Sequence, residues 1–262
     1  MQKRHLDQEQ YFLEQSYTAK KYIIPFIESV TPVNSSTFVL EVGTNKGGNM
    51  DEFLNAGCTI TGVDINSRAI NFANDKYKDA TANGKAKFIC EDIYNVKLSE
   101  KYDLIFLKDT LEHIPDQDNL LKHLRSFLKP DGRIFLAFPP WQMPFGGHQQ
   151  ISTKKLISIC PYFHLLPGFL YFGIMKLFGE KKKKIEELKD IKSTRISINK
   201  FHKILKTNNY IIDKKDYYFV NPNYEVKFKM KPRKLSKLIA SIPYLRNFFI
   251  TTCYYLISQK NN

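Results

Sequence analysis

The sequence is poor in cysteine and tryptophan, and it has no long uninterrupted apolar run. Its four cysteines share no short spacing, which argues against a zinc site or a dense disulfide framework. The first 15 residues lack the apolar core of a signal peptide. We therefore expect a cytoplasmic protein with reduced thiols, with a place at the inner face of the membrane as the alternative.

Acidic residues are scarce in the second part of the chain. Residues 1–150 hold 17 Lys and Arg against 19 Asp and Glu, whereas residues 151–262 hold 23 against 7. The net charge of +14 therefore arises wholly in the second part. A basic block of this kind suggests an anionic partner, which could be phospholipid, a phosphorylated substrate or nucleic acid. The alternative is a lysine-rich surface that only aids solubility.

Hydrophobic residues make up 43% of the 262 residues, which is enough for a sizeable core and excludes a disordered chain. Short β-rich runs alternate with helical stretches through the first 140 residues. The predicted strands are 37–42, 59–63, 87–90, 103–107 and 133–138, and the predicted helices are 49–56, 67–80 and 116–128. This alternation predicts an α/β fold, with a parallel sheet covered by helices on both faces.

Glycine and acidic residues follow the ends of these strands. Glu41 ends the first strand, and the glycine-containing turn at 43–48 then leads into a helix, so that the backbone can approach a ligand closely. Asp64 follows the second strand, where a carboxylate can accept both hydroxyls of a ribose. Glu91 and Asp92 follow the third strand. In a parallel sheet all of these residues lie along the carboxyl edge, where ligands bind.

In order and spacing, five segments resemble the class I S-adenosylmethionine (SAM)-dependent methyltransferases. They are 39–48 (VLEVGTNKGG), 61–65 (TGVDI), 88–93 (FICEDI), 103–114 (DLIFLKDTLEHI) and 128–139 (LKPDGRIFLAFP). The competing interpretation is a dinucleotide-binding oxidoreductase, whose Gly-x-Gly-x-x-Gly turn would also meet Asn45. Glu41 before the turn and the last two segments favour the methyltransferase. That family usually has glycine where Asn45 stands, and asparagine tolerates the left-handed conformation required there.

The resemblance implies a Rossmann-like sheet of seven strands in the order 3-2-1-4-5-7-6, with 251–258 as the antiparallel strand. It also implies how the chain is organised. An N-terminal helical segment (1–36) precedes the SAM-binding core (37–140), and a lid or substrate insertion (141–195) follows. Residues 196–262 complete the sheet and carry a basic insertion at 221–248.

The cofactor that the resemblance implies is SAM, which becomes S-adenosylhomocysteine (SAH) when its methyl group is transferred. On this basis, Glu41 would orient the turn and contact the methionine amino group. Gly43, Asn45 and Gly47 would pass close to the ligand. Lys108 would offer backbone contacts near the methionine.

The adenosine half of the cofactor would be held by the next two motifs. Asp64 would bond the ribose hydroxyls, with Ile65 against the adenine. Asp92 would bond the adenine amino group, and Ile93 would cover the ring. The alternative for each aspartate is an ordinary helix N-cap or turn residue.

The segment 109–113 is similar to one that has been linked to a divalent metal in the quinone-biosynthesis O-methyltransferases. There Asp109, Glu112 and His113 would supply the ligands. Alternatively, Glu112 and His113 only cap and hydrogen-bond the loop over the cofactor. We prefer this second interpretation, in which no metal is bound.

His148 and His113 are the candidate catalytic residues. His148 follows the fifth predicted strand, which ends near the transferring methyl group in the family. Its imidazole could therefore take a proton from the attacking nucleophile. A structural role for His148 is the alternative.

Residues after the fifth strand commonly build the substrate lid in this superfamily, and Trp141 begins them here. Tyr224 and Arg233, in the basic insertion, would contact an anionic or sugar-like acceptor. Residues 156–184 combine an aromatic, proline-broken stretch with a run of four lysines. This pattern predicts either a lid packed on the core or a peripheral membrane contact.

The expected acceptor is a small molecule, a sugar or a lipid-linked compound. Two alternatives stay open: an RNA methyltransferase, and a catalytically inactive SAM-binding protein at the membrane surface. Nucleic acid is the weaker candidate because the sequence has no recognised RNA-binding module. In addition, 108–111 reads KDTL where the amino-methylating enzymes carry Asn/Asp-Pro-Pro-Tyr.

Overall fold

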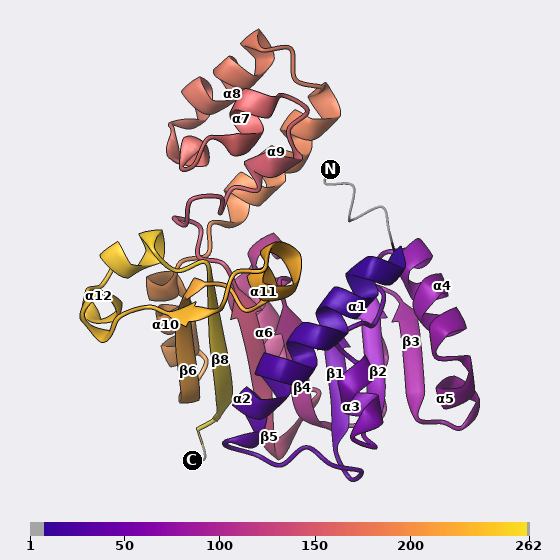
Figure 1. Ribbon diagram of the computed structural model, residues 1–262. Helices are drawn as coiled ribbons and strands as arrows, with labels where there is room; N and C mark the ends of the chain where they lie inside the picture. Colours follow the sequence, from indigo (N-terminus) through magenta and orange to yellow (C-terminus); the bar gives the residue numbers. More distant parts are fainter. Residues whose placement is uncertain (1–7, 261–262) are drawn as a thin grey trace.

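The computed structural model describes residues 8–260, which form a mixed sheet of eight strands with helices on both faces (Figure 1). The strand order is β3-β2-β1-β4-β5-β8-β6-β7. The strands are β1 (Phe38–Val42), β2 (Thr59–Asp64), β3 (Ala86–Cys90), β4 (Tyr102–Lys108), β5 (Leu128–Phe138), β6 (Tyr210–Val220), β7 (Arg233–Lys234) and β8 (Thr252–Gln259).

The predicted α/β fold and antiparallel strand are confirmed, but the predicted number of strands is wrong. Strands β1 to β5 are parallel, and β8 is antiparallel to both β5 and β6. The eighth strand is β7, which pairs with β6 at the edge of the sheet. Two exposed basic residues carry no alternating pattern, so the sequence gives no signal for this strand.

The first helical segment runs as one continuous rod, but its middle is a π-helical turn. It consists of α1 (Gln8–Thr18), the π turn η2 (Ala19–Ile23) and α2 (Ile24–Glu28). Figure 1 shows this rod lying across the face of the sheet in front of β1 and β4. The N-terminal segment therefore covers the sheet.

The helices that connect the parallel strands are shorter than predicted. The helix predicted at 67–80 is divided at Tyr77 into α4 (Ser67–Lys76) and α5 (Lys78–Ala82). The Tyr77 hydroxyl donates to the Gly47 carbonyl at 2.8 Å, so the division anchors an aromatic ring beneath the glycine turn. The other helices here are α3 (Asp51–Asn55), α6 (Gln117–Arg125) and α10 (Ile198–Thr207).

Each face of the sheet carries its own apolar core because successive side chains of a strand point to opposite faces. Val39 and Phe106 pack with the N-terminal helices and α3, whereas Leu40 and Ile105 pack with α6 and α10. All four side chains are fully buried. The parallel strands are thus covered on both faces, as their nearly continuous apolar sequences predict.

The chain between β5 and β6 forms a helical lobe that lies above the sheet (Figure 1, top). It contains η4 (Gln149–Ile151), α7 (Lys155–Ile159), η5 (Phe163–Leu165), α8 (Gly168–Leu177) and α9 (Lys182–Thr194). The lobe has a small core of its own, formed by Ile157, Tyr171, Met175, Ile185 and Leu188. Among the helices within residues 8–260, none is both long and apolar enough to cross a bilayer.

The segment between β6 and β8 forms the remaining helices. They are α11 (Asn223–Phe228), α12 (Lys237–Ser241) and η6 (Leu245–Phe248). Figure 1 shows α11 beside the upper end of the sheet and α12 toward its left edge. The region predicted as a basic insertion therefore has regular structure at several points.

Candidate functional site

A cavity of about 1060 Å³ opens at the carboxyl ends of β1, β2, β3 and β4. Helices α1 and α11 and the base of the lobe complete its wall. Twelve of the residues given a ligand, metal or catalytic role from the sequence line it: Gly43, Asn45, Asp64, Ile65, Asp92, Ile93, Lys108, Asp109, Glu112, His113, His148 and Tyr224. The topology thus brings together motifs from separate parts of the chain.

The turn after β1 combines several left-handed residues. Gly43 has φ of +75°, Asn45 +50° and Gly47 +76°. A Cβ at Gly43 would lie 2.5 Å from the Thr110 hydroxyl oxygen, so only glycine fits there. Asn45 accepts the left-handed conformation that glycine adopts in the related turn, which agrees with the tolerance expected of asparagine.

Glu41 lies beneath this turn and is fully buried. Its two carboxylate oxygens accept hydrogen bonds from the Thr44 hydroxyl at 2.6 Å and from the Asn49 amide at 2.7 Å. Burial raises the pKa of Glu41 to about 8, although these two hydrogen bonds oppose the shift. Glu41 is therefore built to orient the turn. Its contact with a methionine amino group stays a prediction.

Asp64 is held at the cavity by backbone donors. The Asn45 N–H donates to its Oδ2 at 2.8 Å, and the Asn66 N–H donates to its Oδ1 at 2.8 Å. Each oxygen keeps a lone pair for a further donor. The N-cap of α4 is Asn66, so Asp64 is not itself the cap. A fixed carboxylate between the turn and the cavity is suited to a pair of vicinal hydroxyls.

The three residues expected at the adenine, Ile65, Asp92 and Ile93, differ in how far they reach the cavity. Ile65 is 77% exposed at the cavity wall, whereas Ile93 is buried in the core beneath it. The Asp92 carboxylate accepts a hydrogen bond from the Tyr94 N–H at 3.0 Å, which is a turn contact. Ile65 therefore offers an apolar surface that a flat ring could cover. The ligand roles of Asp92 and Ile93 stay predictions.

A cluster of charged groups lies at the end of β4. The Lys108 ammonium is 2.5 Å from the Asp109 carboxylate. Although desolvation opposes the effect, this ammonium holds the pKa of Asp109 below its usual value. Burial, followed by the charge of Asp109, raises the pKa of Glu112 well above its usual value. Burial therefore favours the protonated form of Glu112 over its carboxylate unless a cation joins it.

Two histidines face each other beside Glu112. The ring centroids of His113 and His148 are 5.0 Å apart, with the rings nearly perpendicular. Desolvation, followed by the His113 charge, lowers the pKa of His148 to about 4, and desolvation lowers the pKa of His113 as well. Both imidazoles are therefore neutral at pH 7 and can accept a proton or a metal ion.

The groups that could hold a metal differ from the predicted set. Ligand atoms of Glu112, His113 and His148 all lie within 4.8 Å of one another. Asp109, which the sequence suggested, is instead paired with Lys108. Among the described residues, Glu112 Oε2 has no hydrogen-bond partner although it is buried. An orphaned carboxylate oxygen beside two neutral imidazoles fits a divalent cation.

Four of the predicted site residues do not line the cavity. Glu41 lies beneath the turn, and Gly47 is a buried residue of the turn itself. Trp141 is 9% exposed and packs against His164, with ring centroids 4.7 Å apart, because it closes the base of the lobe. Arg233 is exposed on the edge strand β7. Trp141 and Arg233 therefore lie outside this cavity, and their contact with the acceptor stays a prediction.

Helix α1 contributes cavity residues that the sequence did not suggest. Tyr11 and Gln15 line the cavity from this helix, and Lys227 and Phe228 line it from α11. The two helices lie more than 200 residues apart in the chain, and no local pattern marks their contact. Only the folded chain identifies these residues.

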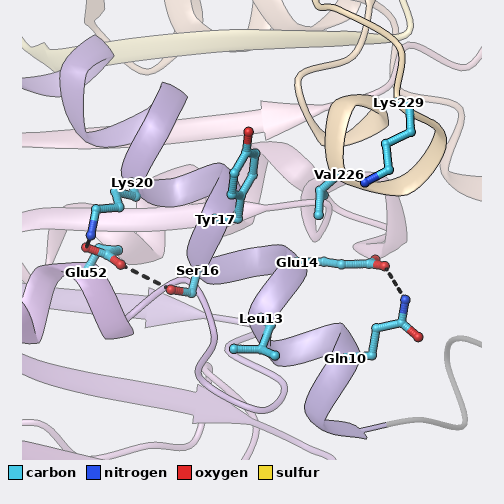
Figure 2. A pocket seen from close by; sticks show the side chains of 9 residues that line it. All are labelled: Gln10, Leu13, Glu14, Ser16, Tyr17, Lys20, Glu52, Val226 and Lys229. Carbon is cyan, nitrogen blue, oxygen red and sulfur yellow. Dashed lines mark hydrogen bonds and ion pairs between the residues drawn. The ribbon is translucent and has the colours of Figure 1, made fainter.

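A network around Glu225 holds the two helices together. The Glu225 carboxylate accepts hydrogen bonds from Tyr17 at 3.2 Å and from Lys21 at 3.1 Å, and it also bonds Tyr22. Figure 2 shows the shallow hollow between α1 and α11, with Tyr17 and Leu13 on one side and Val226 on the other. Both helices also line the cavity, so this contact fixes one of its walls.

A family described as a methyltransferase domain matches residues 16–159, which is more than half of the chain. Among curated proteins, a ubiquinone biosynthesis O-methyltransferase of Coxiella burnetii is 29% identical over 100 residues, covering 38% of this chain and 42% of that protein. A malonyl-[acyl-carrier protein] O-methyltransferase 2 of Ilyobacter polytropus is 31% identical over 180 residues, covering 68% and 64%. This chain thus matches less than two thirds of either relative's length.

Solved structures with the same fold have much lower sequence identity. A magnesium protoporphyrin IX methyltransferase from Synechocystis with bound SAH has a TM-score of 0.56 at 16% identity, covering 97% of this chain and 87% of that chain. A geranyl diphosphate C-methyltransferase from Streptomyces coelicolor, in complex with Mg²⁺, geranyl diphosphate and SAH, has a TM-score of 0.57 at 13% identity, covering 94% and 81%. These likenesses support the fold.

Proposed function

Since the chain belongs to the methyltransferase domain family, we propose that it transfers a methyl group from SAM to a small-molecule, sugar or lipid-linked acceptor. The membership that the sequence motifs predicted is confirmed, and the dinucleotide-binding oxidoreductase is set aside. The acceptor itself and the residues that contact it belong to the proposal.

The observation that carries the proposal is the fixed pair formed by the turn and Asp64. The turn approaches the cavity with left-handed residues at Gly43 and Asn45, and the Asn45 N–H donates to the Asp64 carboxylate at 2.8 Å. Asp64 would then accept the two ribose hydroxyls, with the adenine against Ile65. The methionine end would extend along the turn toward Lys108 and Thr110, which line the cavity at the end of β4.

Methyl transfer itself needs little from the protein beyond positioning. Bound SAM would supply a methyl group on a positively charged sulfur, and in-line attack by the acceptor would break the C–S bond as the new bond forms, with neutral SAH as the leaving group. Holding the two reactants in this geometry supplies most of the rate enhancement. Desolvation lowers the pKa of His148 to about 4, so its imidazole is unprotonated at pH 7 and can accept a hydrogen bond from the acceptor's hydroxyl. The same shift makes it a weak base, so proton removal by His148 would be at most an addition to positioning.

The trio of Glu112, His113 and His148 gives the acceptor side a second option. A divalent cation held there would stabilise the ionised form of Glu112 and polarise an oxygen of the acceptor. The orphaned Oε2 of Glu112 supports this arrangement within the described residues. Without a cation, the same three side chains form a polar wall that can hydrogen-bond a hydroxyl of the methyl acceptor.

Calorimetric titration of the protein with SAM and SAH, with NAD as control, tests the proposal. We expect micromolar binding of both adenosyl ligands and none of NAD. Asp64→Ala removes two charge-assisted hydrogen bonds to the ribose, so we expect its affinity for SAM to fall by about 100-fold. Asp75→Ala, at an exposed position of α4 outside the cavity, is the matched control and should bind SAM normally.

Two results would contradict the proposal. One is tight NAD binding with no response to SAM or SAH. The other is equal SAM affinity of the Asp64→Ala and Asp75→Ala variants. SAM binding without turnover on any acceptor class would favour the inactive SAM-binding protein, and transfer to RNA would favour the RNA methyltransferase.

A further inference from the structure

Two segments of the chain contain no carboxylate. Residues 132–179 and 226–262 together hold 12 Lys and Arg and no Asp or Glu. All 26 acidic residues therefore lie elsewhere in the chain. The first segment includes α7 and α8 of the lobe, and the second includes α12 and η6. A surface built from these segments repels cations and attracts anions.

Both segments also expose large apolar side chains. On α7, Leu156 is 67% exposed and Ile159 is 58% exposed. In the second segment, Leu238 on α12 is 76% exposed, and Tyr244 is 70% exposed. Exposed apolar side chains of this number, beside lysines, are typical of a surface that contacts a partner.

The two segments meet in the fold. The Tyr162 hydroxyl donates to the Phe248 carbonyl at 3.2 Å, and the two rings lie 6.3 Å apart between centroids. The same segments also form part of the cavity wall, through Phe145 from the first and Phe228 from the second. The two segments are therefore in contact at Tyr162 and Phe248, and each of them also reaches the cavity wall.

We propose that these two segments dock on the surface of an anionic phospholipid bilayer. The docking face consists of Lys155, Leu156, Ile159, Tyr162, Lys237, Leu238 and Tyr244. Apolar side chains that enter the interface and lysines that meet anionic headgroups give two weak signals, and two such signals together suffice for stable attachment. Branched aliphatic side chains such as Leu156 and Leu238 favour lipid, because nucleic acid offers them little apolar surface. The proposal does not depend on methyl transfer.

Cosedimentation with vesicles tests the proposal directly. We expect the full chain to bind vesicles of phosphatidylcholine with 30% phosphatidylglycerol far better than pure phosphatidylcholine, and to dissociate as salt is raised. Lys155→Gln with Lys237→Gln should weaken binding by about 25-fold, since each interfacial lysine contributes a factor of about five. Leu156→Ser with Leu238→Ser should weaken binding by at least about tenfold at constant charge.

Matched controls separate the docking face from general charge. Lys78→Gln with Lys87→Gln removes two exposed lysines on α5 and β3, at the opposite edge of the sheet, and should leave vesicle binding within about twofold. Ile211→Ser removes an exposed apolar side chain of β6 and should also have little effect. Unchanged thermal midpoints in all variants exclude misfolding as the cause of a loss.

Three outcomes would overturn the proposal. The first is the same affinity for neutral and anionic vesicles. The second is an equal loss of binding in the Lys78/Lys87 control and in the docking-face variants. The third is absence of vesicle binding by a chain that binds a 20-nucleotide RNA, which would make nucleic acid the partner of this basic surface.

Discussion

The carboxyl edge of the sheet, where we propose that SAM binds, differs from the surface of the lobe and α12 in how its polar groups are paired. At the carboxyl edge, Glu41 and Asp64 each receive two hydrogen bonds from nearby chain, at distances of 2.6 to 2.8 Å. On the lobe and α12, lysines and large apolar side chains face outward instead. The first region is arranged to hold one ligand in one geometry, and the second to meet an extended surface.

This difference explains why the two regions tolerate change differently. The carboxyl edge depends on left-handed backbone and on buried groups with displaced pKa values, so small changes there are costly. The lobe depends on a small core of five residues and on surface composition. Substitutions of the same kind, made in both regions, should therefore have different or even opposite effects.

The largest contrast concerns the pH dependence of stability at Glu41. Burial raises its pKa in the folded state to about 8, so between pH 4.5 and 8 the folded chain holds a proton that the unfolded chain has lost. The stability contributed by this proton is complete below pH 4.5 and is lost as the pH rises to 8. Glu41→Gln mimics the protonated side chain at every pH. The difference in free energy of unfolding between this variant and the wild type should therefore shift in favour of the variant by about 4 kcal/mol from pH 5 to pH 9.

Urea unfolding at several pH values measures this gain. Glu186→Gln is the matched control, because the side chain of Glu186 lies in the lobe and is 53% exposed. Curves for Glu41→Gln and the wild type that stay parallel from pH 5 to pH 9 would contradict the account of Glu41.

A buried histidine of the lobe should show the opposite pH dependence. His164 is fully buried, its Nε2–H donates to the Trp141 carbonyl at 2.7 Å, and burial lowers its pKa to about 4. Its stability contribution is complete above pH 6.5 and is lost as the pH falls toward 4. The wild type should lose free energy of unfolding as the pH falls from 6.5 to 4, and His164→Asn should make this loss about 2 to 3 kcal/mol smaller. Identical acid sensitivity of variant and wild type in urea unfolding would show that His164 is not responsible.

Glycine-to-alanine substitutions should change stability in opposite directions in the two regions. At Gly43, φ is +75° and a Cβ would lie 2.5 Å from Thr110 Oγ1, so Gly43→Ala should cost about 2 kcal/mol or more and weaken SAM binding. Gly173 lies inside α8 at an exposed position, and a Cβ there would meet no described atom within 4 Å. Gly173→Ala should raise stability by about 0.5 to 1 kcal/mol. Thermal unfolding measures both, and destabilisation by both would remove the contrast.

The smallest effect is expected at Asn45. Its φ of +50° suits glycine, and its backbone N–H, not its side chain, donates to Asp64. Asn45→Gly should therefore change stability by less than about 1 kcal/mol and SAM affinity by less than about threefold. If Asn45→Gly instead created SAM binding in a chain that otherwise lacks it, the natural site would be an inactive one.

The sequence predicted the features that depend on local chemistry. The turn at 43–48, Asp64 and the strand–helix alternation follow from residues that lie close together in the chain, and parallel strands bring their carboxyl ends to one edge. The residues that line the cavity from α1 and α11 depend on contacts between distant segments. The pairing of Lys108 with Asp109, which leaves His148 beside Glu112, likewise depends on packing. That Trp141 and Arg233 lie outside the cavity could not be predicted for the same reason, since nothing local shows which way a lid or an edge strand faces.

Amide hydrogen exchange with and without SAH tests the central claim most directly, because it locates the ligand on the chain. The account predicts slower exchange at 43–48, 64–66 and 91–94 when SAH is bound, with exchange in α7 and α8 unchanged. Protection confined to the lobe, with the turn at 43–48 unaffected by bound SAH, would contradict it.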